Sequence, residues 1–161
     1  MFELSPGDWE AVALSLKVAF WSVLFSLPPG IVASSALQGT AEAVAVEGSA
    51  TDTGELTAYV ATGTFGLAIV DVSKFNQPAI LAELNLSGTN TAVAVDTPRG
   101  IAAVAGNAAG LHLVDVSDPA APALIQDVFF PDPVTDVVLY DGLAYVAAGS
   151  NIASVNIATG E

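Results

Sequence analysis

The sequence contains no cysteine and very few basic residues, and these two shortages exclude several kinds of function. Without cysteine the 161-residue chain has no disulfide, no thiolate metal site and no cysteine nucleophile. Only 3 Lys and Arg residues stand against 17 Asp and Glu residues, which gives a formal net charge of −14. So acidic a chain has no basic surface for nucleic-acid phosphates or anionic lipid headgroups. We therefore expect no nucleic-acid partner and interpret the acidity as a solubilising surface.

Histidine is equally scarce, because His112 is the single one in the chain. It lies within an apolar run, where a lone histidine is usually a packed residue rather than a catalytic base. No Ser-His-Asp arrangement is therefore expected. The sequence also has no glycine-rich phosphate-binding motif and no Asp-x-Asp-x-Asp-Gly calcium loop. These absences predict a protein that is not an enzyme and has no cofactor or metal.

Residues 9–37 form a nearly continuous apolar stretch at the N-terminus. Asp8 is a candidate helix N-cap, and apolar side chains between residues 11 and 27 cover most of a helix surface. About 17 residues is the short limit for crossing a bilayer, and Pro28-Pro29 would end or kink the helix. We therefore predict one hydrophobic helix within residues 1–38, embedded in a membrane through residues 9–37.

Two other interpretations of this stretch stay open. Small residues between positions 34 and 41 have the spacing of a signal-peptide cleavage site, but Glu3, Asp8 and Glu10 precede the apolar run without any positive charge. A buried helix of a soluble domain is the third interpretation. With the anchor favoured, we expect a membrane-associated or cell-surface (extracellular) protein.

Residues 8–18 read Asp-Trp-Glu-Ala-Val-Ala-Leu-Ser-Leu-Lys-Val, and residues 23–31 read Val-Leu-Phe-Ser-Leu-Pro-Pro-Gly-Ile. These two segments closely resemble the start of molybdate ABC transporter permeases. In that family this segment is the first transmembrane helix. The resemblance ends near Ala33, and none of the family's later helices follows. It implies an alternative, a truncated permease subunit in the inner membrane, and it favours a fragment or fusion product.

The rest of the chain carries an internal repeat with a spacing of 44 residues. Residues 66–73, Gly-Leu-Ala-Ile-Val-Asp-Val-Ser, return as residues 110–117, Gly-Leu-His-Leu-Val-Asp-Val-Ser. Pro78 and Pro122 keep the same offset. A period in the forties, built from short apolar runs and turn residues, is typical of stacked β-blades.

After residue 38 the apolar pattern changes from helical to strand-like. Asp141-Gly142 between two apolar runs is a hairpin signal. Four strands per repeat correspond to one propeller blade. The fold class we predict for residues 39–161 is therefore all-β, an incomplete β-propeller of four-stranded blades with about 2.75 blades. The eleven expected strands are residues 43–46, 57–61, 66–72, 79–84, 91–95, 101–105, 110–116, 123–129, 136–139, 143–147 and 152–157.

The repeat motif resembles the LVIVD family from about residue 43 to the end. Its members carry Gly-Leu-x-Ile-Val-Asp-Val-Ser followed by a proline, with Ala-Tyr-Val-Ala in the preceding strand. The tetrapeptide occurs here at residues 58–61 and 144–147, and Asn156 stands where the first two units have Asp71 and Asp115. The resemblance implies a secreted or cell-surface repeat protein of bacteria or archaea, without defined catalytic residues.

These observations predict a non-catalytic module that binds an unknown protein or surface ligand. Turns at equivalent blade positions, residues 62–65 and 106–109, are the expected binding loops, with Thr62, Thr64, Phe65 and Asn107 as candidate contacts. Asp71 and Asp115 are expected to form Asx turns rather than a metal site. Unclosed blades and an open edge strand at residues 152–157 also predict self-association.

Overall fold

The computed structural model describes residues 37–48, 56–74 and 76–161. They belong to one compact unit, Ser35–Glu161. The helix that the sequence predicts within residues 1–38, and with it nearly all of the membrane segment 9–37, lies outside the described residues. Within the described ranges no helix is long and apolar enough to cross a membrane.

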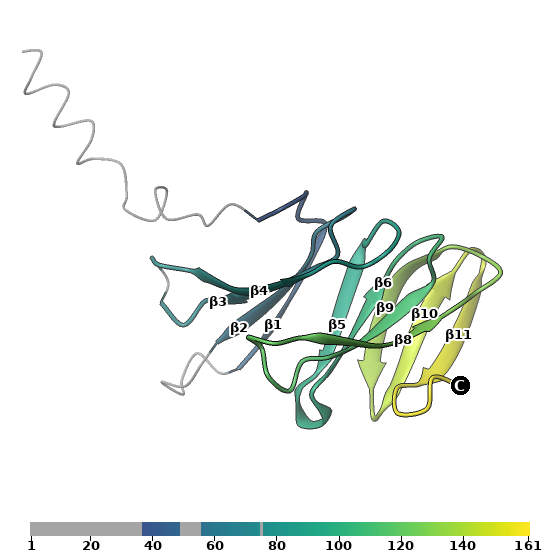
Figure 1. Ribbon diagram of the computed structural model, residues 1–161. Coiled ribbons are helices and arrows are strands. Elements are labelled where there is room, and N and C mark those ends of the chain that lie inside the picture. Colours follow the sequence, from purple (N-terminus) through teal and green to yellow (C-terminus); the bar gives the residue numbers. More distant parts are fainter. Residues whose placement is uncertain (1–36, 49–55, 75) are drawn as a thin grey trace, which may run out of the picture. The chain divides into compact units, whose positions relative to one another are not determined.

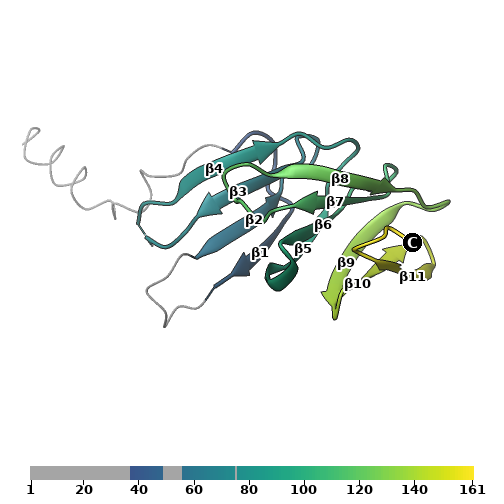
Figure 2. The ribbon, with the colours of Figure 1, turned by 60° about the horizontal axis from the view of Figure 1, so that its bottom comes forward.

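The described part of the chain is all-β, and its eleven strands match the eleven expected ones to within two residues at each end. They form three antiparallel sheets, which we call blade 1 (β1–β4), blade 2 (β5–β8) and blade 3 (β9–β11). Figure 1 shows the blades following one another along the chain, and Figure 2 shows the same succession from below. The strands are β1 (Ala43–Glu47), β2 (Thr57–Ala61), β3 (Leu67–Asp71), β4 (Ala79–Leu84), β5 (Ala92–Asp96), β6 (Ile101–Ala105), β7 (Leu111–Asp115), β8 (Ala123–Val128), β9 (Val134–Tyr140), β10 (Leu143–Ala148) and β11 (Asn151–Asn156).

Each blade is a meander in which consecutive strands pair as neighbours. Blades 1 and 2 have four strands, and blade 3 has three described strands in the order β11-β10-β9. The predicted hairpin between β9 and β10 is confirmed, because Asp141 and Gly142 both have positive φ (47° and 77°). This is the backbone of a two-residue turn that suits the twist of paired strands.

The repeated motif has the same local structure in both complete blades. Gly66 and Gly110 have positive φ, and a Cβ at either position would lie within 2.3 Å of the carbonyl oxygen of Leu84 or Val128. Glycine therefore lets the third strand start in close contact with the end of the fourth. The third and fourth strands also share an irregularity at one position, after Ile69 in blade 1 and after Leu113 in blade 2.

The motif aspartates form the Asx turns that the sequence predicts. Oδ1 of Asp71 accepts the backbone N–H of Ser73, and Oδ1 of Asp115 accepts that of Ser117, each at 2.9 Å. Asn156 repeats this bond in blade 3 with Ala158, also at 2.9 Å. The turn ends the third strand and starts the connection to the next segment.

Apolar side chains between consecutive blades form the core. One cluster joins blades 1 and 2 and includes Tyr59, Ile69, Val104 and Val114. A second cluster joins blades 2 and 3 and includes Leu111, Leu113, Val137 and Val146. The main contacts between blades come from their first two strands, as when blades fan out from an axis.

One face of blade 3 has no blade packed on it within the described residues. Tyr145 occupies the repeat position of Tyr59, yet it is exposed whereas Tyr59 is buried against blade 2. Val138, Tyr140 and Ile152 are exposed on this blade as well. Strand β11 pairs with β10 on one side and is the edge of its sheet.

Candidate functional site

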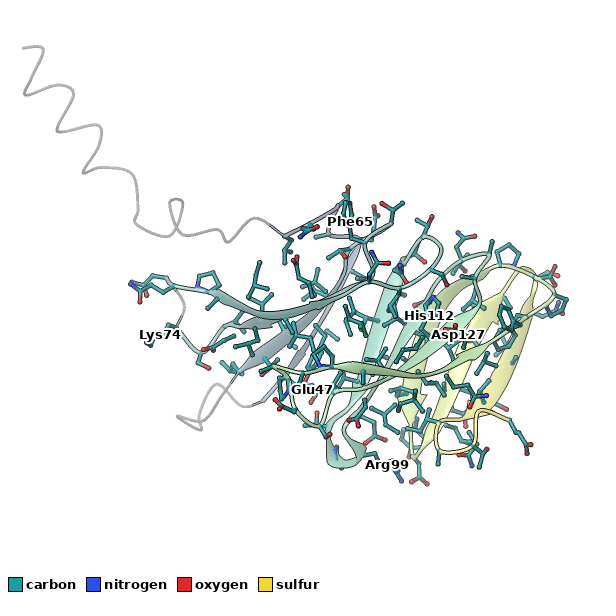
Figure 3. All side chains as sticks on the ribbon, viewed as in Figure 1. Glu47, Phe65, Lys74, Arg99, His112 and Asp127 are labelled. Atoms are coloured by element: carbon teal, nitrogen blue, oxygen red, sulfur yellow. The ribbon has the colours of Figure 1, made fainter. Side chains whose placement is uncertain are left out.

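Each blade has two ends with different connections. We call the linker end the one that holds the turns between second and third strands, at residues 62–66 and 106–110, and the linkers between blades, at residues 85–91 and 129–133. The hairpin end holds the other turns. Figure 3 shows Phe65 at the linker end and Glu47 with Arg99 at the hairpin end.

Backbone hydrogen bonds fix the linker end of one blade to the next. Gly63 and Asn90 exchange N–H···O bonds of 3.2 and 2.8 Å between blades 1 and 2. Asn107 and Val134 exchange two bonds of 3.0 Å between blades 2 and 3. Because these bonds repeat at equivalent positions, the turns of successive blades lie in register along one surface.

The four candidate residues from the sequence have different environments at this end. Thr62 is buried, and its hydroxyl donates to the Gly66 carbonyl at 3.1 Å. Thr64 is exposed at the tip of the same turn, and Phe65 has 43% of its surface exposed. Asn107 is half-buried in the equivalent turn of blade 2, where its backbone bonds to Val134.

A pocket of about 150 Å³ brings two of these residues together. Its wall also contains a carboxylate that is already engaged, because Glu83 Oε1 accepts the backbone N–H of Gln38 at 3.0 Å. Thr64 and Asn107 are not part of the wall. The lining residues are Gln38, Thr62, Phe65, Leu67, Glu83 and Asn85.

Phe65 is the apolar side of this pocket, and it is held in place by the backbone before β1. A Cβ at Gly39 would lie 2.7 Å from Cδ2 of Phe65, and Gly39 has a φ of +89°. The ring therefore packs directly on a glycine backbone, which leaves its other face open. A half-exposed aromatic ring on a fixed backbone is a typical anchor point for a protein ligand.

The single histidine is a packed residue, as the sequence predicts. His112 is 0% exposed, its Nε2 donates to the Ser87 carbonyl at 2.9 Å, and its Nδ1 lies 2.5 Å from Asp127 Oδ1. Figure 3 labels this His–Asp pair. Because a main-chain carbonyl accepts a hydrogen bond from Nε2, this nitrogen is not available to take a proton from a substrate. The pair therefore joins strands β7 and β8 to the linker before blade 2.

Asn90, in the linker before blade 2, has an unsatisfied polar atom. Its side chain is 0% exposed, and Nδ2 donates to the Gly63 carbonyl at 2.8 Å. Its Oδ1 has no hydrogen-bond partner within the described part of the chain. Such an atom normally finds a partner in native proteins, so this oxygen is a candidate position for an ordered water.

The carboxylates of Asp71 and Asp115 accept hydrogen bonds within their own turns. Hydrogen bonds from Ser73, with a smaller contribution from the charge of Lys74, lower the pKa of Asp71. Hydrogen bonds from Ser117 lower the pKa of Asp115. Among the described residues no three His, Cys, Asp or Glu side chains are close enough together to hold a metal ion.

Sequence reasoning found the turns of the linker end but not the residues that complete the pocket. Glu83 and Asp127 share the 44-residue offset of the motif, and both tie the fourth strand to the linker before their blade. That shared offset is the signal that could have identified them. Gln38 and Asn85 carry no such signal, since they meet the turn only through the packing of the linkers.

Comparisons with known proteins agree with this architecture. LVIVD repeats match residues 55–85 and 101–129, which are the second to fourth strands of blades 1 and 2. Among solved structures, Sqt1 of Saccharomyces cerevisiae, which is propeller-like, is similar with a TM-score of 0.59 at 14% identity. The match covers 78% of this chain and 35% of Sqt1, so the chain spans about a third of that structure's length. No curated protein matches the chain.

These findings establish a repeat β-propeller-like fold. They contain no support for the resemblance of residues 8–33 to molybdate permeases, and that segment lies outside the described residues.

Proposed function

We propose that the chain is a non-catalytic binding module that holds a protein ligand at the linker end of its blades. The observation that carries this proposal is Phe65, a half-exposed ring on a rigid backbone beside a polar pocket. Aromatic anchors of this kind contribute a large share of binding energy at protein interfaces. The fixed register of successive turns gives the surface a defined shape before the ligand arrives.

The pocket beside Phe65 suits an extended peptide segment. An apolar side chain of the ligand would cover the open face of Phe65, and polar groups of Gln38 and Asn85 would bond to the peptide backbone. At about 150 Å³ the pocket has room for one side chain rather than for a whole small molecule. Asp127 and the Ser87 carbonyl hold both ring nitrogens of the buried His112, which supports the proposal that this module does no chemistry.

We also propose that the apolar stretch at residues 9–37 attaches the blades to a membrane and so holds them at the cell surface. The length and apolar character of that stretch support this placement. Fractionation of cells that express the full chain would test it. Recovery in the membrane fraction, with loss of that recovery when residues 9–37 are deleted, is the expected result.

The binding proposal is tested by selecting peptides from a random display library on the full chain and mapping them by NMR. We expect the amide shifts to cluster at Gln38, Thr62, Phe65 and Asn85. Phe65→Ser should weaken binding at least about tenfold, because it removes the anchor. Leu124→Ser is the matched control, since Leu124 is 44% exposed on β8 of blade 2 and does not line this pocket. Peptides that bind the Phe65→Ser variant as well as the parent chain would refute the proposal.

A further inference from the structure

A second pocket lies between blades 1 and 2 at the hairpin end, opposite the linker end. It has a volume of about 290 Å³. Most of its polar lining comes from one carboxylate and several hydroxyls. The lining residues are Glu47, Gly48, Thr57, Tyr59, Thr97, Gly100, Val116, Ser117 and Pro119.

Tyr59 lines this pocket, and its hydroxyl is free of hydrogen bonds to the described residues. The residue is 3% exposed. Burial, with a smaller contribution from the negative charge of Glu47, raises the pKa of Tyr59, so the hydroxyl keeps its proton. Among the described residues the fully buried side-chain polar atom without a partner is Asn90 Oδ1, so the Tyr59 hydroxyl is accessible from the pocket that Tyr59 lines. Because tyrosine hydroxyls usually find a hydrogen-bond partner, this hydroxyl is free to bond a ligand group within the pocket.

Glu47 gives the pocket its charge. It also lines an adjoining pocket of about 270 Å³ whose wall contains Asp96, Arg99 and Asp141. Within that pocket Arg99 Nη1 lies 2.7 Å from Asp96 and Arg99 Nη2 lies 3.6 Å from Asp141. Three carboxylates and one guanidinium leave a formal charge of −3 + 1 = −2 along the two walls. Glu47 has no ion pair with any described residue, so this surface attracts a cation.

The repeat itself shows which cation fits a carboxylate at this position. Asp96 ends β5 as Glu47 ends β1, and both residues pair with the first residue of the following strand. In blade 2 the position is filled by the chain's own Arg99, three residues after Asp96. In blade 1 the connection after Glu47, residues 48–56, contains no Lys or Arg. The carboxylate of Glu47 thus lacks the guanidinium that its counterpart has.

We propose that the hairpin-end pocket binds the guanidinium group of an arginine side chain from a partner protein. Glu47 pairs with the guanidinium as Asp96 pairs with Arg99, and a charge-assisted bond of this kind is stronger than a neutral one. The Tyr59 oxygen accepts a further N–H of the same group. A guanidinium is planar with several N–H donors, so it can use both acceptors at once. This site is independent of the linker end, and its success or failure does not decide the function proposed for Phe65.

The test is an NMR titration of the full chain with Nα-acetyl-arginine methylamide. Nα-acetyl-citrulline methylamide is the neutral control of nearly the same shape. We expect saturable amide shifts at Tyr59, Thr97 and Ser117 with the arginine probe, and binding at least about tenfold weaker with the citrulline probe. Raising the salt concentration should weaken binding of the arginine probe.

Three variants complete the design. Glu47→Gln should weaken binding at least about tenfold, and Tyr59→Phe by about threefold to tenfold, because a bond to a charged group is lost in each case. Glu42→Gln makes the same charge change just before the start of β1, at the opposite end of the strand, and should leave affinity within about twofold. A dispersed spectrum of each free variant checks that it is folded. Equal affinity for the two probes, or unchanged affinity in Glu47→Gln, would overturn the proposal.

Discussion

His112 lies directly across the β7–β8 pair from Asp127, and Nδ1 of its ring is 2.5 Å from Oδ1 of the carboxylate. The same register in blade 1 places Ala68 opposite Glu83. A Cβ at Gly106 would lie 2.4 Å from Nε2 of His112, whereas blade 1 has Thr62 at the position of Gly106. The two blades therefore fill one space in two ways, with a threonine side chain or with a histidine ring.

The first prediction concerns the space that the Thr62 side chain fills in blade 1 and the His112 ring fills in blade 2. His112→Ala should lower the free energy of unfolding by about 2–4 kcal/mol, because it leaves a cavity and removes the partner of the Ser87 carbonyl. The double variant Gly106→Thr/His112→Ala copies blade 1 and should recover part of that loss. Denaturant unfolding of the parent, the two single variants and the double variant measures the coupling.

Gly106→Thr alone should be destabilising, since its side chain collides with the His112 ring. If the effects of the two single changes are simply additive, the two blades do not use this space as we describe.

The second prediction concerns Asn90. Val134 holds the equivalent inter-blade position without a polar side chain, and the Gly63 carbonyl also accepts the backbone N–H of Asn90. Asn90→Val should therefore change the free energy of unfolding by no more than about 1 kcal/mol. Asn90→Asp should cost at least about 3 kcal/mol, because it buries an unpaired charge. Equal losses in the two variants would show that the amide has a role that we have not identified.

The third prediction concerns acid. The pKa of Asp115 is lowered in the folded chain by its hydrogen bonds to Ser117. The folded state then binds this proton less readily than the unfolded state, so the stabilisation is present above the ordinary carboxyl range and is lost as the pH falls through the lowered folded value. Asp115→Asn keeps the turn, as Asn156 does, but does not titrate. We expect the Tm advantage of the parent over Asp115→Asn to be greater at about pH 6 than at about pH 2.5.

A Tm difference that stays constant between these two pH values would contradict the assignment. Asp118→Asn is the control for the loss of one carboxylate charge in this region. Asp118 resembles Asp115 in that it accepts a nearby backbone N–H, from Ala120.

The fourth prediction concerns self-association. Ile152 is 83% exposed on the edge strand β11, and the exposed residues Val138 and Tyr145 lie on the same blade. Ile152→Lys should reduce oligomer size in light scattering, because an edge lysine opposes strand pairing and charge opposes apolar packing. Phe129→Lys is the control, an exposed aromatic residue outside the strands. A parent chain that is monomeric at all concentrations would remove the basis of this prediction.

The sequence allowed the fold to be predicted because the repeat carries its information locally. Three features depend only on residues close together in the sequence: the motif that repeats after 44 residues, the alternation of apolar runs with turns, and the Asp-Gly hairpin. The Asx turns of Asp71 and Asp115 could be predicted for the same reason, since the acceptor and donor are two residues apart. The turns of residues 62–65 and 106–109 could be placed at one end from strand order alone.

The contacts that complete the two sites could not be predicted from the sequence, because they depend on strand register and on the packing of one blade on the next. The pairing of His112 with Asp127 requires the irregularity between β7 and β8, which shifts the register by one residue. The pocket of Tyr59 exists only where blade 2 covers blade 1, and the same tyrosine in blade 3, Tyr145, is exposed. Periodicity shows that strands form but not which neighbouring sheet covers them.

The stacking of successive blades positions every site described above, and NMR of the full chain tests it most directly. We expect amide–amide NOEs between Gly63 and Asn90 and between Asn107 and Val134, because each pair exchanges two backbone hydrogen bonds across a blade junction. The amides of Asn90 and Val134 should also be protected from hydrogen exchange together with the central strands. Sheets that show internal NOEs, with neither cross-peaks nor protection at the junctions, would contradict the stacked arrangement and the two sites that depend on it.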